Sequence, residues 1–373
     1  MPRIQPLIFA ACAVAGVAFA PLALAQNAAA PAKPAAQAKK AAPATKTPAP
    51  KADSGAPAED PALTTFRHDL INLLALSGDP HRQIAAAQIA APDEKDASRS
   101  AAKKPPGLIK RALELGPQDP LVLWVAAANA CLTQPGCADP EALKTLQKID
   151  ADNAAVWLQA FPTDGNAEME RASVARMAQT PRYNEYWGAD VVALYHGLEI
   201  LAVPKEITSL GVSSESARIN FATTIASSIL PVSLQRLHQF CIKVDVAADA
   251  ATAADCVAVA RKLESGGTFV AQGIGYAIEE ALLSPGVDKD VMGTRRRSAA
   301  WQKEKFMELS ARFSREPALA QAYIAALEAG PDEPSAVIAF LRGQKQHTDP
   351  PGDWQPAPPP KAPDPLQSPA PQQ

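Results

Sequence analysis

One segment of the chain recurs at a fixed spacing. Gly116–Trp124 reads G-P-Q-D-P-L-V-L-W, and Ile149–Trp157 reads I-D-A-D-N-A-A-V-W, so that the two tryptophans lie 33 residues apart. In both copies a turn is followed by a residue that can cap a helix, and the tryptophan then falls inside that helix. A period of this length is typical of repeats built from two antiparallel helices. The recurrence therefore predicts helical hairpins in this part of the chain.

The composition favours helices throughout. Hydrophobic residues make up 47% of the 373 residues, largely as alanine, whereas aromatic residues make up 5%. Alanine favours closely packed helices, while strands favour β-branched and aromatic residues. Basic and acidic residues number 36 and 39, so no global field attracts nucleic acid or an anionic membrane. We therefore expect an all-α protein that does not bind nucleic acid.

The first 25 residues have the pattern of a secretory signal. Arg3 precedes an apolar run over Leu7–Leu24, and small residues end that run at Ala25. An uncleaved membrane anchor would need about 20 apolar residues, and Pro21 interrupts the run. We expect cleavage after Ala25, a periplasmic or secreted protein, and no transmembrane helix in the mature chain.

Export makes disulfide bonds the expected role of the cysteines. Cleavage removes Cys12 and leaves an even number, which favours disulfides in an oxidising compartment. Three pairings are open, and proximity in the sequence favours Cys131–Cys137 and Cys241–Cys256. Neither pair has the CxxC spacing of redox enzymes, and no histidine lies near the first pair to complete a zinc site. We expect no metal and no cofactor.

The two ends differ in composition from the middle. Residues 26–60 are rich in Ala, Pro and Lys and residues 344–373 are rich in Pro, and neither has a periodic apolar face. We expect both to be disordered, with the lysines of the first able to make weak contact with a cell wall. Between them we expect helical hairpin repeats over 61–203 and a C-terminal helical region over 204–343. The polar segment Asp93–Pro106 is expected to be an exposed loop.

Helix-start signals recur through the first of these regions. Each places a side chain that can cap a helix directly before a proline or small residue suited to the first helical turn. The signals are Asp79-Pro80, Asp119-Pro120, Asp139-Pro140 and Asp152-Asn153.

The period of about 34 residues, the turn before the first helix, and the early Trp124 and Trp157 resemble the tetratricopeptide class of repeat. This resemblance covers about residues 80–200. It implies stacked helical hairpins, an α-solenoid, with a concave surface that binds proteins or peptides. It does not identify the residues that bind.

Beyond Pro204 the period fades, and the expected C-terminal half is an irregular set of helices. Apolar spacing predicts helices over Ala248–Leu263, Phe269–Leu283, Ser298–Phe313, Pro317–Leu327 and Glu333–Leu341.

No recognised catalytic motif occurs, so candidate sites depend on small groups of residues. His196 and Glu199 are three residues apart and share a helix face, where a histidine–carboxylate pair could perform acid–base catalysis. A structural pairing is the alternative. Gly273 and Gly275 could face a phosphate, or they could allow close packing between helices.

A basic cluster is the other candidate. Arg295, Arg296 and Arg297 precede Trp301, and arginine beside tryptophan can bind an anionic or aromatic ligand. The alternative is a solvated helix start with Trp301 packed inward. Glu279 and Glu280 adjoin, so they point in different directions and do not form a glycosidase-type pair.

Two functions follow from these patterns. The first is an exported helical-repeat scaffold without catalysis, which binds a protein or peptide partner in a bacterial-type cell envelope. The second is an enzyme of unrecognised type that acts on envelope glycan or peptide through the C-terminal half. A groove lined by the first helices of the hairpins would favour the scaffold. A pocket that unites His196 with charged side chains would favour the enzyme.

Overall fold

The computed structural model describes residues 61–90, 107–133, 139–162, 165–208, 211–229, 233–330 and 332–356. Within these ranges the chain is all-helical, as the composition predicts, and its β-type pairing is an isolated bridge between Asn153 and Arg182. None of the described helices is both long and apolar enough to cross a lipid bilayer.

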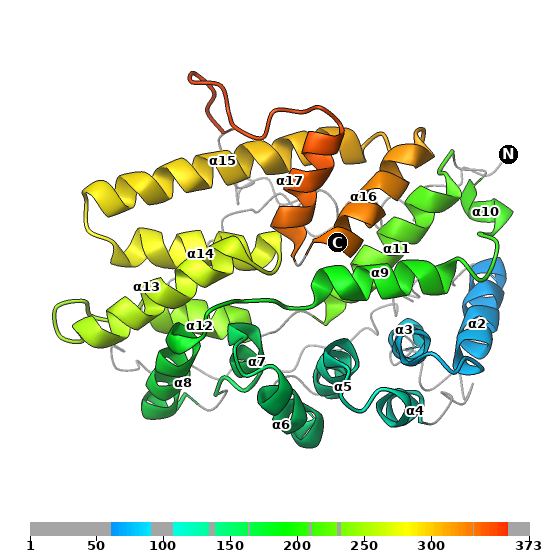
Figure 1. The fold of residues 1–373 in the computed structure, drawn as a ribbon, viewed down its shortest axis with the longest axis horizontal. Helices are drawn as coiled ribbons and strands as arrows, with labels where there is room; N and C mark the ends of the chain where they lie inside the picture. The colour runs from blue at the N-terminus through cyan, green and yellow to red at the C-terminus, as the bar shows by residue number, and fades with distance from the viewer. Residues whose placement is uncertain are drawn as a thin grey trace, which may run out of the picture.

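Seven helices form the N-terminal part of the described chain. They are α2 (Pro61–Ala75), α3 (Pro80–Ala90), α4 (Leu108–Leu115), α5 (Pro120–Thr133), α6 (Pro140–Ile149), α7 (Ala154–Gln159) and α8 (Ala167–Gln179). Each packs against the next in chain order, and α3 also packs against α5. In Figure 1, α3 to α8 follow one another along the lower part of the molecule.

The predicted helix starts are confirmed by their hydrogen bonds. Asp119 Oδ1 accepts from the main-chain N–H groups of Leu121 and Val122 at 2.9 and 3.1 Å. Asp139 caps α6 in the same way. At α7 the cap is Asn153 rather than Asp152. Such caps each contribute about 1 kcal/mol, so short polar side chains fix where these helices begin.

The two recurring tryptophans occupy different environments. Trp124 is 1% exposed in the middle of α5, with its ring 5.6 Å from that of Tyr186. Trp157 is half-buried on the six-residue α7, its Nε1 donates to the carbonyl of Ala151, and Arg176 lies 4.6 Å over its ring. The 33-residue spacing therefore places two tryptophans on helices without giving them equivalent packing.

Nine helices form the rest of the described chain. They are α9 (Trp187–Leu198), α10 (Lys205–Thr208), α11 (Ser214–Ser228), α12 (Ser233–Cys241), α13 (Ala250–Ser265), α14 (Phe269–Leu282), α15 (Val287–Ser310), α16 (Pro317–Ala329) and α17 (Glu333–Gly343). α9 packs on α3, α11 and α16, while α12 packs on α7 and α13 packs on α8. These later helices thus cover one side of the N-terminal row (Figure 1).

Two large apolar cores hold most of the described helices together, and each spans both parts of the chain, while a small third cluster of Tyr276, Met292 and Ala299 joins α14 to α15. The first combines residues of α5 to α8 with residues of α12 to α14, and the second combines α2 and α3 with α9, α11, α16 and α17. The helices before and after residue 204 therefore share their cores.

One predicted disulfide is present: Cys241 on α12 is bonded to Cys256 on α13. It closes a sequence separation of 15 residues and fixes the angle between two neighbouring helices. The second predicted bond, Cys131–Cys137, falls outside the described residues, as does the loop Asp93–Pro106.

Two boundaries differ from the sequence prediction. α15 begins at Val287 and not at Ser298, because the charged residues before Ser298 are good helix formers that an apolar pattern overlooks. Residues 344–356, assigned to the tail, lie against α15 after the end of α17 (Figure 1), where side chains of α15 bind them.

Candidate functional site

His196 lies in the last turn of α9 with both ring nitrogens engaged. Its Nδ1 is 2.8 Å from Glu199, and its Nε2 is 2.7 Å from Glu328 on α16. Partial burial lowers the pKa of His196, but the two carboxylates outweigh burial and raise it above its usual range. The predicted pairing with Glu199 is confirmed. Nε2 ties α9 to α16, whereas Nδ1 pairs within α9 at its C-terminal cap, so in this structure both ring nitrogens are occupied by carboxylates.

The three consecutive arginines point in three directions, because successive residues of a helix are about 100° apart. They lie in the middle of α15, so the interpretation as a solvated helix start is wrong. Arg295 is directed at α13 and α14, Arg296 lies 3.6 Å from Glu280, and Arg297 binds the tail. They do not form one basic patch.

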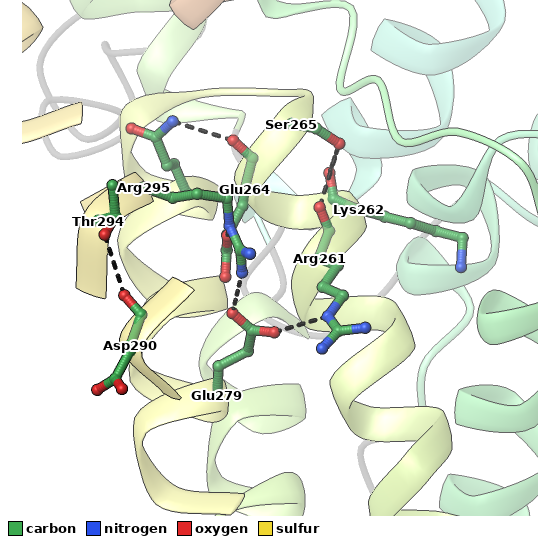
Figure 2. Close-up of polar contacts among 9 residues, drawn as sticks. Arg261, Lys262, Glu264, Ser265, Glu279, Asp290, Thr294 and Arg295 are labelled. Atoms are coloured by element: carbon green, nitrogen blue, oxygen red, sulfur yellow. Dashed lines mark hydrogen bonds and ion pairs between the residues drawn. The ribbon is translucent and has the colours of Figure 1, made fainter. Parts of the chain in front are cut away.

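Arg295 completes a buried ion cluster, shown in Figure 2. Its Nε donates to Glu264 at 2.8 Å, and its Nη2 donates to Glu279 at 2.5 Å. Arg261 binds the other oxygen of Glu279 at 2.9 Å. Glu264 and Glu279 are 6% and 0% exposed. The cluster therefore links α13, α14 and α15 through two buried carboxyl groups and two partly exposed guanidinium groups.

The two carboxyl groups in this cluster have opposite pKa shifts. Burial, followed by the hydrogen bond to Glu279, raises the pKa of Glu264 to about 8. Burial also opposes ionisation of Glu279, but hydrogen bonds from Glu264 and Arg261 outweigh it and lower its pKa. The opposite shifts favour a proton on Glu264 and a charge on Glu279.

This arrangement has the chemistry of an acid–base pair, in which one carboxyl is protonated and its neighbour is ionised. Both carboxyl groups lie beneath the guanidinium groups of Arg261 and Arg295, however, whose side chains are 50% and 37% exposed. A substrate would reach them only after an arginine moved. In the state described, the cluster fastens three helices together.

Trp301 does not pack inward into the core, as one of the two interpretations predicted. It is half-buried, its ring lies edge-on to that of Trp354 at 5.3 Å, and its Nε1 donates to the carbonyl of His347 at 2.9 Å. It therefore packs beneath the tail rather than in the core or against an open surface.

Gly273 and Gly275 lie inside α14, where the packing interpretation fits Gly275. A Cβ atom at Gly275 would lie 2.6 Å from the carbonyl oxygen of Ala260 on α13. The absence of a side chain thus lets α13 and α14 approach closely enough for Glu264 and Glu279 to meet.

Two further buried acids escaped the sequence analysis. Asp190 on α9 is 1% exposed and accepts from Gln88 at 2.7 Å. Glu185 is also 1% exposed and accepts from the hydroxyls of Thr268, at 2.9 Å, and Tyr183. Burial raises the pKa of each to about 7. Gln88 and Thr268 lie 102 and 83 residues from the acids they bind, and Tyr183, two residues before Glu185, does not by itself signal a buried acid.

The structure also contains a cleft that no sequence pattern predicted. It has a volume of about 600 Å³ and lies between α8, α12 and the α12–α13 connection. The lining residues are Gly165, Glu170, Arg171, Arg236, Gln239, Phe240, Lys243, Val244, Asp245, Ala248 and Asp249. Arg171 pairs with Asp249 at 3.1 Å, and Arg236 with Glu170 at 3.4 Å. The Cys241–Cys256 bond joins the two helices on either side of the connection.

Within the described ranges, His, Cys, Asp and Glu side chains do not converge in groups of three or more that could hold a metal ion. Comparison with protein-family models, curated proteins and solved structures finds no match to this chain. Its function must therefore be argued from its own contacts.

Proposed function

We propose that this protein is an exported helical scaffold that binds a protein or peptide partner in a bacterial-type cell envelope, through the cleft between α8 and α12. The observation that carries the proposal is the cleft itself. Its volume of about 600 Å³ lies within the range of about 300–1,000 Å³ that is usual for ligand sites. Phe240 and Val244 provide apolar surface, and charged residues of both signs surround them.

The charges of the cleft suit a peptide that carries charges of both signs. The side chains of Arg171 and Asp249 are 55% and 34% exposed, so water screens their attraction and a ligand can compete for either one. Arg236 and Glu170 are less exposed, at 32% and 12%, and they hold the wall in place. The disulfide beside the cleft restricts the motion of the α12–α13 connection, so a ligand loses less affinity to the entropy cost of ordering it.

The cleft fits the proposal better than the concave groove that the repeat resemblance implies. Packing of α9 on α3, of α12 on α7 and of α13 on α8 covers one side of the N-terminal row. A partner in a groove on that side would have to displace helices that share the protein's cores.

Site-specific cross-linking tests the proposal. A photo-reactive amino acid is placed at Ala248 in the cleft, or at exposed Lys148 on α6 as a control, and the exported protein is irradiated in intact cells. We expect one partner to be captured from Ala248 and not from Lys148. Arg171→Glu should weaken binding of that purified partner by at least about tenfold, and Lys148→Glu by less than about twofold. Equal capture from both positions, or full binding by the Arg171 variant, would refute the assignment.

One observation favours the alternative, an enzyme that acts on envelope glycan or peptide through the C-terminal half. The pKa values of Glu264 and Glu279 are shifted in opposite directions, as in an acid–base pair. Under this alternative Glu279→Gln abolishes turnover of cell-wall fragments, while Arg296→Met, a change on the exposed face of α15, leaves turnover unchanged. No turnover by the wild-type chain would eliminate it.

A further inference from the structure

Residues 345–356 are bound to α15 almost entirely through their main chain. Carbonyl groups along this segment, called the strap here, accept hydrogen bonds from three side chains of α15. Trp301 Nε1 donates to His347 at 2.9 Å, and Gln302 donates to Thr348 at 3.1 Å. The acceptors of Arg297 are Pro351, Gly352 at 2.9 Å and Trp354 at 2.9 Å.

The three donor side chains form one hydrogen-bonding surface on α15. Arg297 and Trp301 are four residues apart, so they lie on the same side of the helix, and Gln302, the residue after Trp301, reaches the strap from about 100° around the helix. Lys305 lies 4.5 Å over the ring of Trp301 and supports it from the next turn. A helix of 24 residues holds these side chains in place, so the surface does not depend on a loop.

Donors aimed at carbonyl groups suit a proline-rich ligand. Proline has no N–H, so an extended proline-rich segment presents carbonyl acceptors without donors of its own to satisfy. Recognition of such segments elsewhere relies on aromatic side chains, and here Trp301 supplies both an aromatic ring and an N–H donor. The strap itself contains Pro350, Pro351 and Pro356.

The strap is also poorly buried, which makes it replaceable. Pro351, Gly352 and Asp353 are exposed, and Trp354 is the half-buried side chain among them, with its ring against Trp301. Carbonyl contacts do not depend on the identity of the side chains that the strap carries. Another proline-rich segment could form the same hydrogen bonds.

We propose that the surface formed by Arg297, Trp301 and Gln302 is a binding site for a proline-rich segment of another polypeptide, and that the chain's own strap occupies it until that segment displaces it. The proposal goes beyond the cleft between α8 and α12, because it uses different residues and a different helix. Each site can be disabled without touching the other.

Competition within the full chain tests the proposal. Trp354→Ala removes the ring contact of the strap, and its position in an exposed segment leaves the helices unchanged. The probe is a fluorescent peptide with the sequence of residues 345–356, and binding is measured by fluorescence anisotropy. We expect the Trp354→Ala chain to bind the probe at least about tenfold more tightly than the wild-type chain, because its internal competitor is weakened.

Further variants, each made in the Trp354→Ala chain, locate the site. Arg297→Ala should weaken probe binding by at least about tenfold, and Trp301→Phe, which keeps a ring and loses the N–H, should weaken it by a smaller factor. Arg296→Ala should have no effect, since Arg296 lies beside Glu280. A probe with glycine in place of each proline should bind more weakly, because the more flexible chain loses more conformational freedom on binding.

Three results would overturn the proposal. They are equally weak binding by the wild-type and Trp354→Ala chains, unchanged binding after Arg297→Ala, and equal binding of the glycine probe.

Discussion

Replacing Arg295 with methionine tests the structural role of the buried ion cluster. Methionine keeps an unbranched apolar stem and removes the guanidinium group, so packing beside α13 and α14 is largely preserved. The change leaves Glu264 and Glu279 with one cation, Arg261, which contacts only Glu279. The expected cost depends on whether Glu264 carries a charge.

At about pH 6 Glu264 is protonated, because its pKa in the fold is raised to about 8 by burial. The variant then loses two hydrogen bonds to buried acceptors, each contributing about 1.5–3 kcal/mol when charged. The side chain of Arg295 is 37% exposed, so screening reduces this sum to about 2 kcal/mol. At about pH 9 Glu264 ionises in the wild type, whereas in the variant it keeps its proton because its pKa rises further without Arg295, so the cost grows by about 1.4 kcal/mol.

Glu264→Gln isolates the pH dependence. The folded pKa of Glu264, about 8, exceeds the unfolded value of 4.5. The unfolded chain therefore loses this proton first, and stability declines as pH rises between these two values. Glutamine removes that decline, although the buried acids Glu185 and Asp190 still contribute their own. In the Glu264→Gln background, the cost of Arg295→Met should be the same at about pH 6 and about pH 9.

The assay is urea denaturation followed by circular dichroism at both pH values. Arg296→Met is the matched control: it is the same substitution one residue away, on a side chain that is 60% exposed beside Glu280. A surface pair of this kind contributes at most about 0.5 kcal/mol. Equal free energies of unfolding for the two methionine variants, or a cost for Arg295→Met that does not grow with pH, would refute the cluster as described.

Three further predictions use thermal or chemical denaturation. Trp124→Ala should lower the free energy of unfolding by about 3–5 kcal/mol and Trp157→Ala by about half as much, because only the first ring is fully buried. Equal losses would show that the two tryptophans are energetically equivalent. Gly267→Ala should destabilise by about 1–3 kcal/mol, since φ is +80° and a Cβ would collide with a tyrosine ring, whereas Gly293→Ala inside α15 should stabilise by about 0.5–1 kcal/mol. Reduction of the α12–α13 disulfide should cost about 3 kcal/mol, and an unchanged midpoint would show that the bond adds nothing.

The sequence predicts the parts of this fold that depend on local chemistry. Asp119 and Asp139 mark helix starts because a short carboxylate satisfies N–H groups within three residues of itself. The Cys241–Cys256 bond is predictable because the two cysteines are close in the sequence. In each case the residues that determine the structure are neighbours along the chain.

The candidate sites depend on contacts that the chain makes over long separations, and these the sequence does not reveal. Glu328 is 132 residues from His196, and the acceptors of Arg297 are more than 50 residues beyond it. Arg261 stands three residues before Glu264 and suggests a local pair, but it binds Glu279 on α14, so the local sequence indicates the wrong partner. The 33-residue spacing of Trp124 and Trp157 misleads in another way: it predicts equivalent positions in a repeat, but the two side chains differ in burial and in their contacts.

The three adjacent arginines show why a run of like charges in a sequence does not establish a single binding surface. Three adjacent cations read as one patch, but a helix distributes them to a buried ion cluster, an exposed glutamate and the strap. Arg295 stabilises the fold through the buried ion cluster, and Arg296 forms a surface pair that water screens. Arg297 alone donates to groups that another molecule could supply. Substitution of Arg295 should therefore lower stability, substitution of Arg296 should have no measurable effect, and substitution of Arg297 should weaken peptide binding. A triple substitution would combine these effects and conceal their separate causes.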